Sequence, residues 1–205
     1  MHWEHVEDFE QSGFRFRLDV APDYGIDPPW EHEDGHGPVR RVYAESYYSR
    51  GAPRDKRPGE RVLWADRHEF LLYDWQEAMK TARRDRWGLA DEDRAKLAAR
   101  LGREPTAGEV CAESVARDFE YLRRWCDGGW WWTCLRVTLL DVEGEPVDDF
   151  TEYLGGVESD SEDYAKECAR DMAAQIVHEI KPRIGRKKTL VIERPARVER
   201  IRLRA

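Results

Sequence analysis

The chain has 205 residues, with 34 Lys and Arg against 42 Asp and Glu, a formal net charge of −8 and a mean hydropathy of −0.83. It holds no stretch near the roughly 18 apolar residues of a membrane span, and its N-terminus is acidic where a secretory signal is basic and then apolar, so we expect a cytoplasmic protein with no membrane contact. Nine Trp, eight Tyr and six Phe exclude a disordered acidic chain, because they supply the apolar surface of a core.

The first part of the chain has the patterns of strands broken by a polar loop. Apolar and charged residues alternate over 14–19, which predicts the first strand. The run 27–38 is rich in Pro, Gly and carboxylates and predicts an irregular loop. A strand-like segment follows over 39–48, and the segments 61–65 and 69–73 predict a hairpin.

Three capping signals predict where helices begin. Each joins Asp, Thr or Ser to a Glu three residues later: Asp74 and Glu77, Thr106 and Glu109, Ser159 and Glu162. The helices predicted after them end near Gly88, Gly128 and Pro182, and a shorter helix is predicted over 91–101.

The order of these elements predicts the fold class. Strands over 130–142 and 147–154 follow the central helices, so strands are grouped before and after a helical block. This pattern is typical of an α+β domain with a mainly antiparallel sheet packed by three or four amphipathic helices. We expect residues 1–180 to form that single domain, and residues 181–205 to form a basic extension that makes strands and docks on the domain.

The basic C-terminal segment, residues 181–205, contains ten Lys and Arg against two Glu, whereas the preceding residues contain 24 against 40. Alternation of arginines with apolar residues predicts a strand with an arginine-lined edge, which suits phosphate contacts. The candidates for nucleic-acid binding are Arg186, Lys187, Lys188, Arg197, Arg200, Arg202 and Arg204. Two alternatives stay open: the segment docks on the acidic remainder of its own chain, or its edge strand pairs across a homodimer.

Residues that could carry chemistry are few. Five possible metal ligands lie close together: Glu31, His32, Glu33, Asp34 and His36. Gly35 and Gly37 disfavour the helix that would align the two histidines, so a solvated acidic loop with Trp30 packed as an anchor is the preferred interpretation. The sequence has no P-loop, dinucleotide fingerprint, zinc-protease motif or nucleophile elbow. The four cysteines lack zinc or redox spacing. We therefore expect no metal, no cofactor and no enzymatic activity.

The triplet Trp130-Trp131-Trp132 raises a second question. In a strand, Trp131 would lie on one face and its two neighbours on the other. Burial on both faces is the preferred interpretation, because large aromatic side chains are mostly buried. If only one face is covered, the other offers an aromatic patch that stacks a base or anchors a protein partner. Trp30 and Trp131 are thus candidates for partner binding.

Five blocks of sequence, in order, resemble a family of small accessory proteins of tailed phages and prophages with no established activity. The blocks are 30–41, 56–63, 73–88, 118–145 and 155–173, and together they cover about residues 30–178. Because such phage proteins commonly bind host machinery, the resemblance implies an accessory protein in the bacterial host cytoplasm that binds a host protein through an acidic surface. It would inhibit or modulate a defence factor (CRISPR or restriction) or a replication factor. The alternative is a nucleic-acid-binding accessory protein that uses the basic C-terminal segment.

Overall fold

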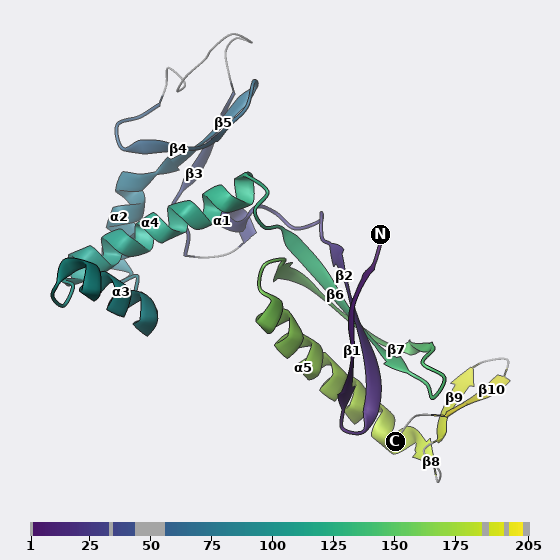
Figure 1. The fold of residues 1–205 in the computed structure, drawn as a ribbon. Helices are drawn as coiled ribbons and strands as arrows, with labels where there is room; N and C mark the ends of the chain where they lie inside the picture. The colour runs from purple at the N-terminus through teal and green to yellow at the C-terminus, as the bar shows by residue number, and fades with distance from the viewer. Residues whose placement is uncertain (1, 33–34, 44–55, 186–188, 195–196, 203–205) are drawn as a thin grey trace. The chain divides into compact units, whose positions relative to one another are not determined.

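The computed structural model describes residues 2–32, 35–43, 56–185, 189–194 and 197–202 (Figure 1). The chain groups into two compact units. Unit 1 consists of Met1–Ile26 and Trp130–Ala205, and unit 2 is Asp27–Gly129, which lies between these two parts in the sequence. The sequence pattern, which predicted one domain over residues 1–180, did not indicate this division.

Unit 1 is built on a four-stranded antiparallel sheet with the strand order β1-β2-β6-β7. The strands are β1 (Glu4–Gln11), β2 (Phe14–Pro22), β6 (Trp132–Leu140) and β7 (Pro146–Glu158). Strand β2 pairs with β6 along its whole length, from Arg15 opposite Leu140 to Pro22 opposite Thr133. The sheet therefore joins the two segments of unit 1, one of which precedes unit 2 in the sequence while the other follows it.

Helix α5 (Glu162–Ile180) packs on one face of this sheet (Figure 1). The sequence of this helix has a stripe at four-residue spacing, Tyr164, Cys168, Met172, Ile176 and Ile180, which predicts its buried face. The structure buries the last three of these residues, whereas Tyr164 is 57% exposed. The reason is geometric: a four-residue step exceeds one helical turn by about 40°, so the stripe drifts off the buried face. Ala173 and Val177 take up the contact.

The predicted capping box of α5 is wrong. The residue before the helix is Ser161, and its side chain makes no capping hydrogen bond. The hydroxyl of Ser159 instead accepts a hydrogen bond from the Trp131 amide at 3.0 Å. The Ser159 hydroxyl, which the local pattern assigned to the helix cap, is thus used in a contact with a residue distant in the sequence.

Unit 2 combines a small sheet with helices. Its antiparallel sheet has the order β3-β5-β4, and the elements are α1 (Pro29–His32), β3 (Val39–Tyr43), β4 (Glu60–Ala65), β5 (Glu69–Asp74), α2 (Trp75–Arg84), α3 (Asp91–Leu101) and α4 (Ala107–Cys126). The core of the unit joins Tyr73 of β5 and Ala82 of α2 to Cys111, Val115 and Leu122 of α4. Helix α4 therefore holds the unit together.

Both other predicted caps are confirmed. Asp74 Oδ1 accepts the Glu77 amide at 2.9 Å at the start of α2. Thr106 and Glu109 form a complete capping box at the start of α4. Arg103 pairs with Glu109 at 2.6 Å, and this hydrogen bond, together with those from Thr106, lowers the pKa of Glu109 to about 2.

The described part of the basic C-terminal segment forms a separate antiparallel sheet of order β10-β9-β8. After a 3-10 turn (Lys181–Arg183), its strands are β8 (Ile184–Gly185), β9 (Thr189–Arg194) and β10 (Arg197–Arg202). The described residues of this segment thus include three strands. The α+β class is confirmed, with three antiparallel sheets among the described residues in place of the single sheet expected. No helix among the residues that the structure describes combines the length and apolarity needed to cross a bilayer.

Candidate functional site

Unit 1 contains a pocket of about 1030 Å³ beside the first turns of α5, which we call the Trp131 pocket. Residues of the sheet, of α5 and of the segment before β6 line it together. Its apolar lining includes Val6, Leu18, Val20, Trp131, Leu135 and Ala165. The pocket is large enough for one or two side chains of a binding partner or for a small ligand.

Two backbone contacts fix Trp131 at this pocket. Its amide donates to Ser159 Oγ at 3.0 Å, and the Ser159 amide donates to the Trp131 carbonyl oxygen at 2.9 Å. Trp130 and Trp132 are buried and pack edge to face, with ring centroids 4.9 Å apart. Trp131 itself is 50% exposed, in contrast with the preferred interpretation of burial on both faces. The backbone at Trp131 is thus fixed, and half of its large aromatic side chain is left uncovered.

Two further apolar side chains are exposed around the same pocket. Tyr24, just after β2, is 91% exposed, and Val6 of β1 is 40% exposed. Val6 lies at an irregularity of β1, where His5 pairs with Asp19 and Glu7 with Leu18, so Val6 has no partner in the ladder register. Scattered exposed apolar residues are ordinary, but three around one pocket are typical of an interaction site.

Carboxylates surround the pocket. Glu4 of β1, Glu158 and Glu162 line it, and residues 158–167 carry five carboxylates against one lysine. That lysine, Lys166, binds Glu162 at 2.5 Å, and this hydrogen bond lowers the pKa of Glu162 and raises that of Lys166. The lysine charge is therefore offset locally, and the rim is negative.

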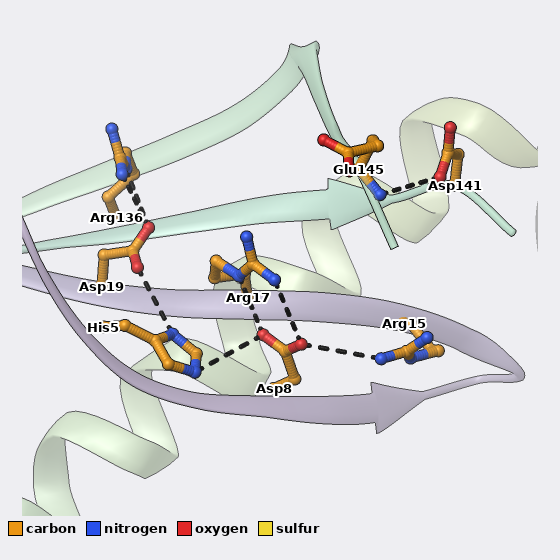
Figure 2. Close-up of polar contacts among 8 residues, drawn as sticks. All are labelled: His5, Asp8, Arg15, Arg17, Asp19, Arg136, Asp141 and Glu145. Atoms are coloured by element: carbon orange, nitrogen blue, oxygen red, sulfur yellow. Dashed lines mark hydrogen bonds and ion pairs between the residues drawn. The ribbon is translucent and has the colours of Figure 1, made fainter. Parts of the chain in front are cut away.

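The other face of the sheet carries a network of paired charges (Figure 2). Asp8 accepts hydrogen bonds from Arg17 at 2.9 and 3.3 Å, and this contact lowers the pKa of Asp8. Asp19 accepts from Arg136 at 2.7 Å, and His5 lies 3.5 Å from Asp19 and 3.8 Å from Asp8 (Figure 2). Because these arginines already have carboxylate partners, this face is poorly suited to binding phosphate.

In unit 2, Asp118 of α4 joins three elements. Its carboxylate accepts hydrogen bonds from the Gly37 amide at 2.8 Å and the Tyr73 hydroxyl at 2.6 Å, and it lies 2.6 Å from His36 Nδ1. A Cβ at Gly37 would collide with the Tyr73 ring, so only glycine fits there. Burial raises the pKa of Tyr73, which keeps its hydroxyl protonated as a donor. The cluster ties the loop after α1 to α4.

The metal candidates His32 and His36 have different surroundings, and Glu33 and Asp34 lie outside the described residues. His36 binds Asp118 and stacks on Tyr121, with ring centroids 5.5 Å apart. His32 is exposed on α1. Within the described ranges, no three His, Cys, Asp or Glu side chains converge as metal ligands would.

The remaining candidates fall in different parts of the chain. Trp30, in unit 2, packs edge to face on Trp125 at 5.3 Å between ring centroids. The arginines at 197, 200 and 202 lie on β10, where they pair in register with Arg194, Val191 and Thr189. The other basic candidates lie outside the described residues: Arg186, Lys187, Lys188 and Arg204.

Sequence reasoning found Trp131 but missed its neighbours. Val6 and Tyr24 were not singled out, and Ser159 was assigned to a helix cap. The only local signal for Val6 was a weak apolar pattern, Val6 and Phe9, within an acidic stretch that lacked regular alternation.

Comparison of the chain with protein-family models, with curated proteins and with solved structures gave no match in any of the three. The function is therefore inferred from the geometry of the sites and from the sequence.

Proposed function

We propose that the chain is a protein-binding module whose interface is the Trp131 pocket. One observation carries this proposal: the side chain of Trp131 lines an apolar pocket and is 50% exposed, although two hydrogen bonds with Ser159 fix its backbone. Because its backbone is already ordered, this tryptophan loses only the freedom of its two side-chain torsions on binding. Tryptophan is also among the side chains that contribute most to protein interfaces.

The charges around the pocket set the chemistry of the partner. Glu4, Glu158 and Glu162 belong to its lining, and the flanking segments are acidic as described above. A partner segment with one apolar or aromatic anchor between Lys or Arg residues matches both features. Such complementarity mainly raises the association rate and the specificity, and it weakens with salt.

The pocket is proposed as a binding site without catalysis. Both of its serines are already engaged, because Ser159 Oγ accepts the Trp131 amide and Ser161 Oγ donates to Glu158 at 3.3 Å. Neither hydroxyl is paired with a histidine as an activated nucleophile would be.

The resemblance to phage accessory proteins suggests who the partner is. We extend the proposal to a host defence factor (CRISPR or restriction) or a replication factor, in the host cytoplasm, whose basic surface normally binds nucleic acid. The acidic rim would occupy that surface and thereby inhibit or modulate the factor.

A peptide selection tests the proposal directly. The full chain serves as bait for a random peptide library, with the Trp131→Ala variant as counter-selection. We expect enrichment of peptides with one Trp, Phe or Leu flanked by Lys or Arg. A consensus without basic residues, or equal enrichment by the Trp131→Ala variant, would overturn the proposal.

A gel shift separates this function from the alternative. The full chain and a chain that ends at Lys181 are compared for binding of DNA and RNA. This truncation leaves the four-stranded sheet intact, because β9 and β10 pair only with each other and with β8 among the described strands. Salt-sensitive binding that is lost on truncation would favour nucleic-acid recognition by the basic C-terminal segment.

A further inference from the structure

Unit 2 contains a second pocket, of about 580 Å³, where the end of α2 meets the start of α4. Three arginines line it, Arg83, Arg86 and Arg94, and its lining includes no Asp or Glu. This composition stands out in a chain whose carboxylates outnumber its basic residues, 42 to 34. We call it the arginine pocket.

Two of the three arginines of this pocket differ from their neighbours in pairing. Nearby arginines bind carboxylates closely: Arg84 with Asp85 at 2.7 Å, Arg100 with Glu113 at 2.5 Å and Arg103 with Glu109 at 2.6 Å. Arg94, the third arginine of the pocket, forms an ion pair with Glu104 at 3.8 Å. In the part of the chain that the structure describes, neither Arg83 nor Arg86 forms an ion pair. Arg83 and Arg86 therefore keep positive charges that no ion pair among the described residues offsets.

The backbone places Arg86 in an unusual conformation. Helix α2 ends at Arg84 with Asp85 as its C-cap, and the Trp87 amide donates back to the Ala82 carbonyl at 2.9 Å, so Arg86 takes the left-handed turn with φ of 55°. Glycine is the usual residue at this point of a helix end, because a side chain there is strained. Here the strained position is occupied by Arg86, whose side chain lines the pocket.

The loop that carries Arg86 is fixed to α4. Ser114 Oγ donates to the Gly88 carbonyl at 2.8 Å, and Cys111 Sγ contacts the Ala82 carbonyl at 3.4 Å. Both hydrogen-bonding residues lie on α4, whose first turn also lines the pocket through Ala107 and Gly108. The arginine backbone is thus held in one arrangement before any ligand arrives, which reduces the entropy lost on binding.

We propose that the arginine pocket binds the phosphate groups of a nucleotide. The planar guanidinium group matches phosphate oxygens through paired hydrogen bonds, and the absence of carboxylates favours an anion over a cation. The volume suits a small ligand. Trp87, partly buried in the same lining, supplies aromatic surface for the base.

Calorimetry on the full chain tests the proposal with three probes: pyrophosphate, ADP and adenosine. We expect millimolar or tighter binding of pyrophosphate and ADP that weakens with salt, and no binding of adenosine at the same concentration. The absence of heat with ADP, or equal binding of adenosine, would overturn the proposal. A short DNA strand that binds more tightly than ADP would also overturn it, in favour of a polymer.

Variants locate the site. Arg83→Ala with Arg86→Ala should weaken ADP binding by about tenfold or more, since each lost charged hydrogen bond approaches that factor. The matched control is Arg123→Ala, roughly 24 Å further along α4, which should leave binding unchanged. Equal weakening by the control would overturn the assignment.

The Arg86→Gly variant separates binding from folding. Because glycine relieves the left-handed strain, this variant should unfold at a higher urea concentration than the natural chain while binding ADP more weakly. A purely structural arginine would give the opposite result, a lower urea midpoint with ADP binding unchanged, and that result would overturn the proposal.

Discussion

Removal of the Asp118 carboxylate should destabilise unit 2 by several kcal/mol. The side chain is 7% exposed and accepts hydrogen bonds from the Gly37 amide and the Tyr73 hydroxyl. Asp118→Ala leaves both donors without an acceptor, and Tyr73 is fully buried. Each buried donor left unpaired costs about 1–3 kcal/mol, so the two together cost about 2–6 kcal/mol.

Asp118→Asn should cost much less, about 1 kcal/mol. The amide oxygen can still accept from Gly37 and Tyr73, while its NH₂ group donates to Nδ1 of His36 when the imidazole carries its proton on Nε2. The matched control is Glu120→Ala, on the same helix at an exposed position, where the ion pair with Arg123 contributes within about 0.5 kcal/mol.

Urea unfolding with hydrogen exchange measured by mass spectrometry provides the assay. Peptides that cover residues 35–38 and 69–74 report on the cluster itself, so loss in unit 2 is distinguished from loss in unit 1. An Asp118→Ala variant as stable as Glu120→Ala would refute the reasoning, because the three contacts would then contribute nothing net.

Three other outcomes follow from the structure. Burial raises the pKa of Cys126 to about 12, so its thiol should not react with a thiol reagent at about pH 8 until the protein is unfolded. The hydrogen bond from Arg40 lowers the pKa of Glu60 in the folded protein. The ionised Glu60 carboxylate therefore stabilises the fold at pH values above the unfolded pKa of 4.5, and this stabilisation is lost as the pH falls through the lower folded pKa. Urea midpoints measured down to about pH 3 should therefore fall less steeply in Glu60→Gln than in the natural chain. Gly37→Ala should destabilise unit 2, measured by the same urea assay, because its methyl group would meet Tyr73; a midpoint unchanged from the natural chain would contradict this.

Local patterns predicted the local parts of the fold. The Thr106 capping box and the Asp74 cap depend on residues three positions apart, so their sequence signals are complete in themselves. The same signal failed at Ser159, because Trp131, 28 residues away, competes for that hydroxyl. A cap is predictable only where no distant donor reaches it.

The sequence pattern did not predict features that depend on residues far apart in the chain. Strand β1 was missed because the irregularity at Val6 interrupts its alternation and carboxylates fall on both faces. The pairing of β2 with β6 spans the whole of unit 2, and nothing in either strand specifies its partner. The inserted unit was missed for the same reason.

The two candidate sites also differ in how much of them the local sequence predicted. Trp131 was a candidate from the triplet alone. Its exposure, however, depends on the start of β6 at the next residue, Trp132, and on the hydrogen bond from its amide to Ser159. Arg83 and Arg86 carried no signal, because arginines at the end of a helix are ordinary. Only the meeting of α2 with α4 makes a pocket of them.

The central claim is that Trp131 anchors a basic protein partner. The most direct measurement is the affinity of a peptide from the selection for the full chain, for Trp131→Ala and for Tyr153→Ala, an exposed aromatic residue outside the Trp131 pocket. Truncation of a central tryptophan costs about 2 kcal/mol or more, so we expect Trp131→Ala to bind roughly 30-fold more weakly and Tyr153→Ala to bind as the natural chain does. Equal affinity of the natural chain and Trp131→Ala would contradict the account.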